Sequence, residues 1–163
     1  MTQQNNEGTP MDTRTQDKLY FDDLKPGMRF TTDRLTVSAE EIKAFADQFD
    51  PQPFHLDEAA AEQSLFGGLA ASGWHTASLT MRLMVTSGIP LANGSIGAGV
   101  ELNWPNPTRP GDELHVVMEI QEMIPSRSKP DRGIVVVRNE TRNQHDQVLQ
   151  VMTAKMVAFR RPA

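Results

Sequence analysis

Residues 69–85 read LAASGWHTASLTMRLMV, a long stretch of small and apolar side chains. Such side chains occur on nearly every side of a helix drawn through this stretch, so hydrophobic periodicity alone does not separate helix from strand. Its length and its low content of β-branched residues favour a buried helix. We therefore expect the rest of the domain to be built around this segment.

Downstream of this helix the pattern changes to runs rich in Val and Ile. Four such runs predict strands, at residues 95–104, 113–123, 133–143 and 148–159. One central helix followed by long antiparallel strands predicts an α+β fold, in which a curved sheet wraps around the helix. The free edges of such a sheet commonly pair with a second subunit, so we expect a homodimer or a higher homo-oligomer.

Upstream of residue 69 the sequence predicts a strand over residues 28–37 and then an amphipathic helix. Ser38 and Glu41 fit a capping box at the start of that helix. Apolar side chains then recur at helical spacing, at Ile42, Phe45, Ala46 and Phe49. Because proline disfavours helix at the residue before it, the Pro51 that follows Asp50 should end the helix at Asp50.

The composition of the chain excludes several classes of protein. Its 163 residues suit a single folded domain, and its formal net charge of −5 gives no global basic field for nucleic acid or an anionic membrane surface. The chain has no cysteine, which excludes disulfides, thiolate metal sites and a cysteine nucleophile. The four histidines are scattered, so no metal site is predicted either.

The first 18 residues differ in composition from the rest of the chain. Residues 1–18 are rich in Gln, Asn, Thr and Asp and predict a disordered leader before a single domain over residues 19–163. No apolar run has the length of a membrane span, and the N-terminus lacks the apolar stretch of a secretory signal. We therefore expect a cytoplasmic protein.

The stretch Asp50-Pro51-Gln52-Pro53-Phe54-His55 places a carboxylate and an imidazole five residues apart around a proline-stiffened turn. A rigid turn can direct both side chains at one point. A carboxylate and a neutral imidazole that face one water molecule can perform general acid–base catalysis. The same spacing also fits an Asp50 that only satisfies backbone N–H groups and a structural His55.

The start of the predicted central helix, Ser72-Gly73-Trp74-His75, is a second candidate site. A glycine there lets a ligand approach backbone N–H groups that lack partners, and the helix dipole favours developing negative charge. Packing of Gly73 against a neighbouring strand is the alternative, and Ser72 as N-cap fits both. His75 is expected to be a hydrogen-bonded structural or interface residue.

Three cations, Arg127, Lys129 and Arg132, lie within six residues of an otherwise acidic chain. Such a cluster fits either a solvated loop or a phosphate-binding loop.

Residues 45–57 and 66–74, with Pro110-Gly111-Asp112-Glu113-Leu114, resemble MaoC-like dehydratases and (R)-specific enoyl-CoA hydratases of the hot-dog fold. The likeness covers roughly residues 20–159. It implies a hydro-lyase of fatty acid metabolism that adds water to a trans-2-enoyl thioester, or removes it, with an (R)-3-hydroxyacyl product. It also implies that Asp50 and His55 hold the water, while the N–H of Gly73 polarises the thioester carbonyl.

The same resemblance implies an acyl-CoA or acyl-carrier-protein thioester as ligand and no cofactor beyond the CoA of the substrate. We expect Ser72 and Trp74 to contact this substrate. We expect the cluster Arg127, Lys129 and Arg132 to contact the phosphates of CoA. The chain departs from the family at Gln52 and Ser72, where members often carry Asn and His, so the hydrogen bonds around the pair are expected to differ.

Two other functions remain open from the sequence. A thioesterase of the same fold would bind the same ligand, but many such enzymes present a carboxylate from the central helix, and residues 73–87 contain no Asp or Glu. That difference favours hydration. A noncatalytic acyl-thioester-binding module would keep the fold without the reaction, and the presence of both Asp50 and His55 favours an enzyme.

Overall fold

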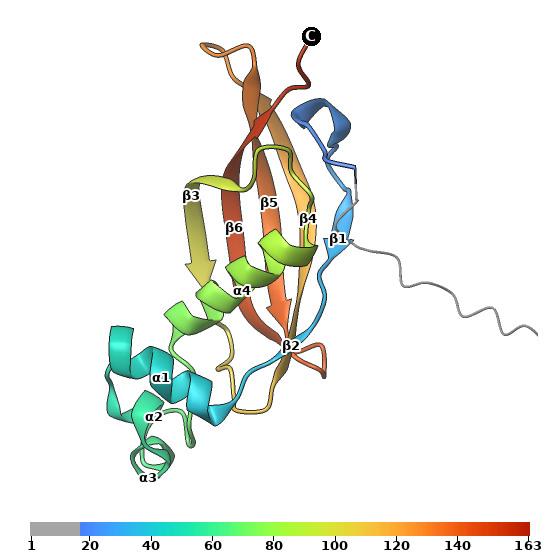
Figure 1. Ribbon diagram of the computed structural model, residues 1–163. Coiled ribbons are helices and arrows are strands. Elements are labelled where there is room, and N and C mark those ends of the chain that lie inside the picture. Colours follow the sequence, from blue (N-terminus) through green and yellow to red (C-terminus); the bar gives the residue numbers. More distant parts are fainter. Residues whose placement is uncertain (1–16) are drawn as a thin grey trace, which may run out of the picture.

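The computed structural model describes residues 17–163 (Figure 1). Most of the predicted leader, residues 1–16, lies outside the described residues. A short 3-10 turn, η2 (Phe21–Asp23), comes first. The helices are α1 (Ala39–Phe49), α2 (Pro53–Leu56), α3 (Glu58–Glu62) and α4 (Gly73–Ser87). The strands are β1 (Arg29–Thr31), β2 (Leu35–Thr36), β3 (Ile96–Asn103), β4 (Glu113–Pro125), β5 (Arg132–Arg142) and β6 (Val148–Phe159).

The six strands form one antiparallel sheet in the order β1-β4-β5-β6-β3, with β2 also pairing with β4. Helix α4 lies across one face of this sheet, and α1, α2 and α3 gather at one end of it (Figure 1). The sheet is curved around α4 but is not closed. This is the α+β hot-dog arrangement that the sequence predicted.

The core lies between α4 and the sheet. Side chains alternate between the two faces of a strand, and buried residues accordingly alternate with less buried ones along β5 and most of β6. In β4 the buried residues lie between Leu114 and Ile120. Leu83 and Met84 of α4 belong to the same buried cluster as Met118 and Val137 of the sheet. The opposite face of α4 is exposed, which corrects the expectation of a buried helix, because the sheet of one chain covers only one side of it.

The single strand predicted over residues 28–37 is interrupted. β1 ends at Thr31 and β2 starts at Leu35. At the break, the backbone N–H of Val116 donates to the Oγ1 of Thr32 over 2.9 Å, so a side-chain hydroxyl accepts where a strand carbonyl would. The N–H of Asp33 donates to Ser87 Oγ on α4 over 2.8 Å. These contacts divide the predicted strand into two short ones.

Helix α1 has the predicted boundaries. Ser38 Oγ accepts from Glu41 N over 3.1 Å, Glu41 Oε2 accepts from Ser38 N over 3.3 Å, and the helix ends before Asp50. Phe49, expected on the buried side, is 63% exposed. Helix α2 was not predicted; it starts at Pro53, whose fixed φ and missing N–H suit the first helical position.

Strand β3 forms one edge of the sheet, and seven of its eight residues are exposed, Val100 by 61%. Along residues 17–163, no helix is both long enough and apolar enough to cross a membrane.

Candidate active site

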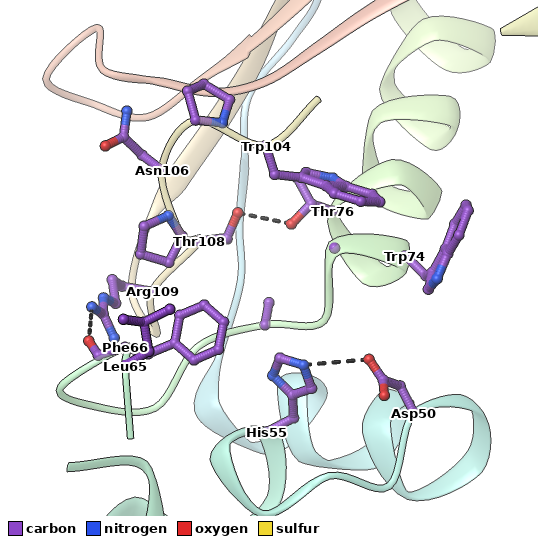
Figure 2. Close-up of a pocket in the computed structure, with 14 residues that line it drawn as sticks. Asp50, His55, Leu65, Phe66, Trp74, Thr76, Trp104, Asn106, Thr108 and Arg109 are labelled. Atoms are coloured by element: carbon purple, nitrogen blue, oxygen red, sulfur yellow. Dashed lines mark hydrogen bonds and ion pairs between the residues drawn. The ribbon is translucent and has the colours of Figure 1, made fainter. Parts of the chain in front are cut away.

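Asp50 and His55 lie side by side where α1 passes into α2. Asp50 is the C-cap of α1, and its N–H donates to the carbonyl of Ala46 over 2.9 Å. His55 lies in α2 and is buried. Asp50 Oδ2 lies 3.3 Å from His55 Nε2 (Figure 2). The turn through Pro51 and Pro53 therefore brings the carboxylate and the imidazole together.

The orientation of the His55 ring is fixed by its other nitrogen. Nδ1 lies 2.6 Å from the carbonyl oxygen of Ala70. A carbonyl can only accept, so Nδ1 carries the proton of this hydrogen bond and Nε2 faces Asp50. In the neutral ring Nε2 then has a free lone pair beside the carboxylate, which is the arrangement that a water molecule can join by donating to both groups.

Asp50 is held as a carboxylate. Burial opposes its ionisation, but hydrogen bonds from Ser72 and Gln52 and the electrostatic interaction with His55 outweigh this and lower the pKa of Asp50 below its usual value. Ser72 Oγ donates to Asp50 Oδ2 over 2.7 Å, and Gln52 Nε2 donates to Oδ1. The two residues that depart from the family pattern are thus the direct hydrogen-bond partners of Asp50.

A pocket of about 580 Å³ opens beside the pair (Figure 2). Asp50, His55, Gly73 and Trp74 all line it, so the structure brings these four predicted site residues together. Ser72 does not line the pocket; it is fully buried and acts on Asp50 instead. Trp74 is 62% exposed, at the rim.

Gly73 is the first residue of α4, and its N–H has no acceptor within the described chain, as expected at a helix N-terminus. The indole of Trp104 lies directly against it. A Cβ added to Gly73 would lie 2.6 Å from Trp104 Cε2, so no other residue fits without moving the ring. Gly73 therefore packs closely, and its role toward a ligand stays a prediction.

Trp104 was not predicted as a site residue. Its Nε1–H donates to Gln150 Oε1 over 2.9 Å, and Gln150 Nε2 donates to Thr80 Oγ1 over 3.0 Å. Thr80 Oγ1 in turn donates to the carbonyl of Thr76 in α4 over 2.8 Å. Gln150 and Thr80 are fully buried, so this chain of hydrogen bonds ties the indole over Gly73 to β6 and α4.

The connection between β3 and β4 supplies the opposite wall of the pocket. Thr108 Oγ1 lies 2.8 Å from Thr76 Oγ1, and both residues are buried. Arg109 also lines the pocket. Sequence reasoning missed both, although Arg109 directly precedes the Pro110-Gly111-Asp112 turn that carries part of the resemblance.

The cluster Arg127, Lys129 and Arg132 is not brought to this pocket. It lies at the turn between β4 and β5, at the end of the sheet opposite α1–α3 (Figure 1). Arg132 pairs with Asp131 over 2.9 Å and stacks on Phe159. None of the three residues lines the pocket, and their contact with CoA phosphates stays a prediction.

His75 also lies outside the pocket. It faces a groove of about 470 Å³ between α1, α4 and β2 and stacks on Phe45 with ring centroids 4.6 Å apart. Its Nδ1 is buried and, among residues 17–163, has no hydrogen-bond partner, so the expected hydrogen bond is not made at that nitrogen. Burial lowers its pKa, against the opposing charge of Glu41.

The site offers a base, an imidazole and a free backbone N–H around one cavity. A water held by Asp50 and His55 can lose a proton to the carboxylate, and the N–H of Gly73 can stabilise negative charge on an oxygen nearby. In the described part of the chain, no group of three or more His, Asp or Glu side chains is arranged to hold a metal ion.

A family profile and a solved structure of a similar protein indicate the same family. The profile of the family described as "MaoC like domain" matches residues 23–143. A crystal structure of a MaoC-like dehydratase from Rhodospirillum rubrum is 63% identical, with a TM-score of 0.88 over 89% of this chain and 99% of that one.

Two curated relatives are more distant. An uncharacterised protein of Bacillus subtilis, YdeM, is 35% identical over 78% of this chain and 90% of its own length. A 3-hydroxybutyryl-CoA dehydratase of Methylorubrum extorquens is 33% identical over 68% of this chain and 69% of its own length.

Proposed function

The chain belongs to the MaoC-like domain family, and we propose that it is a hydro-lyase acting on an enoyl-CoA-type thioester. It adds water to the 2,3 double bond, or removes it in the reverse direction. The observation that carries this proposal is the approach of Asp50 Oδ2 to His55 Nε2, 3.3 Å apart, in a pocket that also contains Gly73. The dehydratase activity named for the Methylorubrum extorquens relative is of the same class.

In the hydration direction, Asp50 takes a proton from the bound water while the water oxygen forms a bond to C3. The π electrons of the double bond move toward the thioester, and the resulting enolate oxygen accepts a hydrogen bond from the N–H of Gly73. The proton that the Asp50–His55 pair has gained is then delivered to C2. The pair returns to its starting state, and the (R)-3-hydroxyacyl thioester leaves.

Hydrolysis of the thioester is the competing reaction. Helix α4, over Gly73–Ser87, has no Asp or Glu, and Asp50 is the single carboxylate among the described residues that line the pocket. A carboxylate positioned on the central helix for hydrolysis is therefore missing from the described site, and this favours hydration.

We also propose that the active form is a homodimer or a higher homo-oligomer. The exposed edge strand β3 and the exposed side chains of α4, among them Met81 and Val85, are the candidate interface. In such an assembly we expect the cluster Arg127, Lys129 and Arg132 to contact the phosphates of a CoA thioester that is bound in another copy's pocket.

The test follows the conjugated enoyl absorbance of crotonyl-CoA in the presence of the protein, with free CoA measured in the same sample. A hydratase removes the absorbance without releasing CoA. Release of CoA at the rate of absorbance loss would identify a thioesterase. No change with crotonyl-CoA or with longer, branched and dicarboxylic enoyl thioesters would identify a noncatalytic binding module.

A further inference from the structure

Arg109 is the single Lys or Arg among the described residues that line the active-site pocket. Its Nη1 donates to the carbonyl oxygens of Gly68 over 2.8 Å and of Leu69 over 3.3 Å, and its Nη2 donates to the carbonyl of Phe66. These three main-chain contacts hold the planar guanidinium in one place before any ligand arrives. A group fixed in this way loses little entropy when it binds a ligand.

The charge of Arg109 is not neutralised by a carboxylate. Within residues 17–163 its guanidinium forms no ion pair with Asp or Glu at 4.0 Å or less, and Asp112 accepts from the main-chain N–H of Arg109 over 2.8 Å. A guanidinium also carries more N–H donors than three contacts use. Its Nε–H and its second Nη2–H have no acceptor in the described part of the chain. A partly buried cation with free donors at a pocket wall is therefore open to an anion.

The anion must bind away from Asp50. The ionised carboxylate of Asp50 would repel a second negative group beside it. Figure 2 shows Arg109 and Asp50 on opposite sides of the pocket, with His55 between them. A ligand with a negative group is thus oriented by the pocket, with that group at Arg109 and its neutral end near the catalytic pair.

The pocket wall also carries two hydroxyl groups. Thr76 Oγ1 and Thr108 Oγ1 lie 2.8 Å apart, and both line the pocket. In such a pair one hydroxyl donates to the other, so one O–H proton remains for a ligand. A buried hydroxyl left without a partner by a long alkyl chain would be unfavourable, so this wall suits a polar acyl group.

We propose that Arg109 binds a carboxylate at the distal end of the acyl group, which makes the substrate class the monothioester of a short dicarboxylic acid. This inference rests on the proposed function and names the substrate of the same site. A distal carboxylate lies a few bonds from the thioester carbon and can reach the wall of the catalytic pocket. The phosphates of CoA are separated from that carbon by the whole pantetheine arm.

The test measures binding without turnover. Saturated butyryl and succinyl thioesters do not react as enoyl substrates, and each is prepared on CoA and on N-acetylcysteamine, which lacks phosphates. The two tryptophans of the chain, Trp74 and Trp104, both line the pocket and report binding by fluorescence. Succinyl thioesters should bind about tenfold more tightly than butyryl thioesters on both carriers.

Variants test whether the charge of Arg109 causes the preference for succinyl over butyryl thioesters. Arg109→Met should abolish it on both carriers, while Arg109→Lys should retain part of it. In the control variant Arg127→Ala/Lys129→Ala/Arg132→Ala the preference should be unchanged, and any loss of affinity should be confined to the two CoA thioesters.

Three results would overturn the proposal. One is equal affinity of the wild type for succinyl and butyryl thioesters, and another is a loss in Arg109→Met confined to the CoA thioesters. The third is an equal loss of affinity for all four ligands in Arg109→Met. It would show that Arg109 only holds the loop at residues 66–69 in place. If Arg109→Met does not fold, the wild-type protein alone provides the test. A preference for succinyl thioesters that weakens at high salt supports binding of the carboxylate by a positive charge, and the absence of a preference refutes it. Because no ligand reacts, failure of the hydration assay leaves this result interpretable.

Discussion

Ser72 Oγ donates a hydrogen bond of 2.7 Å to Asp50 Oδ2, the carboxylate oxygen that faces His55. Ser72 is also the N-cap of α4, where it accepts from the N–H of Trp74 over 3.3 Å. One hydroxyl therefore links the start of the central helix to the proposed base. Ser72, which the sequence predicted to contact the substrate, acts through Asp50 instead.

Replacing this hydroxyl should raise the pKa of Asp50, because the hydrogen bond from Ser72 favours the ionised form. We expect a higher titration midpoint for the Asp50 carboxyl carbon in Ser72→Ala, measured by NMR and assigned with Asp50→Asn. Loss of the cap should also lower stability by about 1 kcal/mol. Ser72→Thr keeps the hydroxyl and should retain the low midpoint; equal midpoints in wild type and Ser72→Ala would refute the link.

Gln150 should support activity from a distance through Trp104. In Gln150→Leu the indole Nε1–H loses its acceptor and Thr80 Oγ1 loses one of its hydrogen bonds, so the free energy of unfolding should fall by about 1–3 kcal/mol in urea titrations. Because the indole of Trp104 is then no longer fixed over Gly73, kcat/KM for enoyl hydration should also fall. Gln121→Leu, at an exposed position of β4, is the control. Unchanged kcat/KM in folded Gln150→Leu would leave the network a purely structural role.

Local patterns were sufficient to predict most elements of the fold. The capping box at Ser38 and Glu41 and the Val- and Ile-rich runs of β4, β5 and β6 involve neighbours in sequence, and all appear in the structure. The prediction of one strand over residues 28–37 was wrong because the hydroxyl of Thr32 and the backbone N–H of Asp33 form hydrogen bonds with β4 and α4, which no local pattern encodes.

The site could be predicted only where its residues share one short stretch. Asp50 and His55 are joined by a single proline turn, so their proximity follows from the sequence. Trp104 and Arg109 reach the pocket through the path of the β3–β4 connection, which depends on how the whole sheet packs. The cluster Arg127, Lys129 and Arg132 is dense in sequence, yet the β4–β5 hairpin carries it to the far end of the sheet.

Acidification should destabilise the protein through His75. Burial lowers the pKa of His75 in the folded state, whereas the unfolded chain takes up the proton near pH 6.5. The neutral imidazole therefore contributes its full stability above pH 6.5, and this is lost as the pH falls from there toward the lowered folded pKa. His75→Phe, which can still stack on Phe45, should make the urea midpoint less dependent on pH between 7.5 and 5.5. An unchanged pH dependence would contradict this.

The edge strand β3 should mediate self-association. The wild type should sediment with a mass of at least about twice the 18.1 kDa of one chain. Val100→Lys places a charge on the exposed edge, where two copies would bring like charges together, and should shift the protein toward monomer. Ile124→Lys, at another exposed apolar position, is the control and should not. A monomeric wild type would rule out this interface.

The most direct test of the account compares Asp50→Asn with Asp47→Asn in the hydration of an enoyl thioester. Asn has nearly the volume of Asp but cannot take the proton of water, whereas Asp47 is exposed on α1 and does not line the pocket. We predict that kcat falls by about 10²- to 10⁴-fold in Asp50→Asn with the fold retained, and stays at the wild-type value in Asp47→Asn. Wild-type turnover in a folded Asp50→Asn would contradict the central claim that Asp50 is the base.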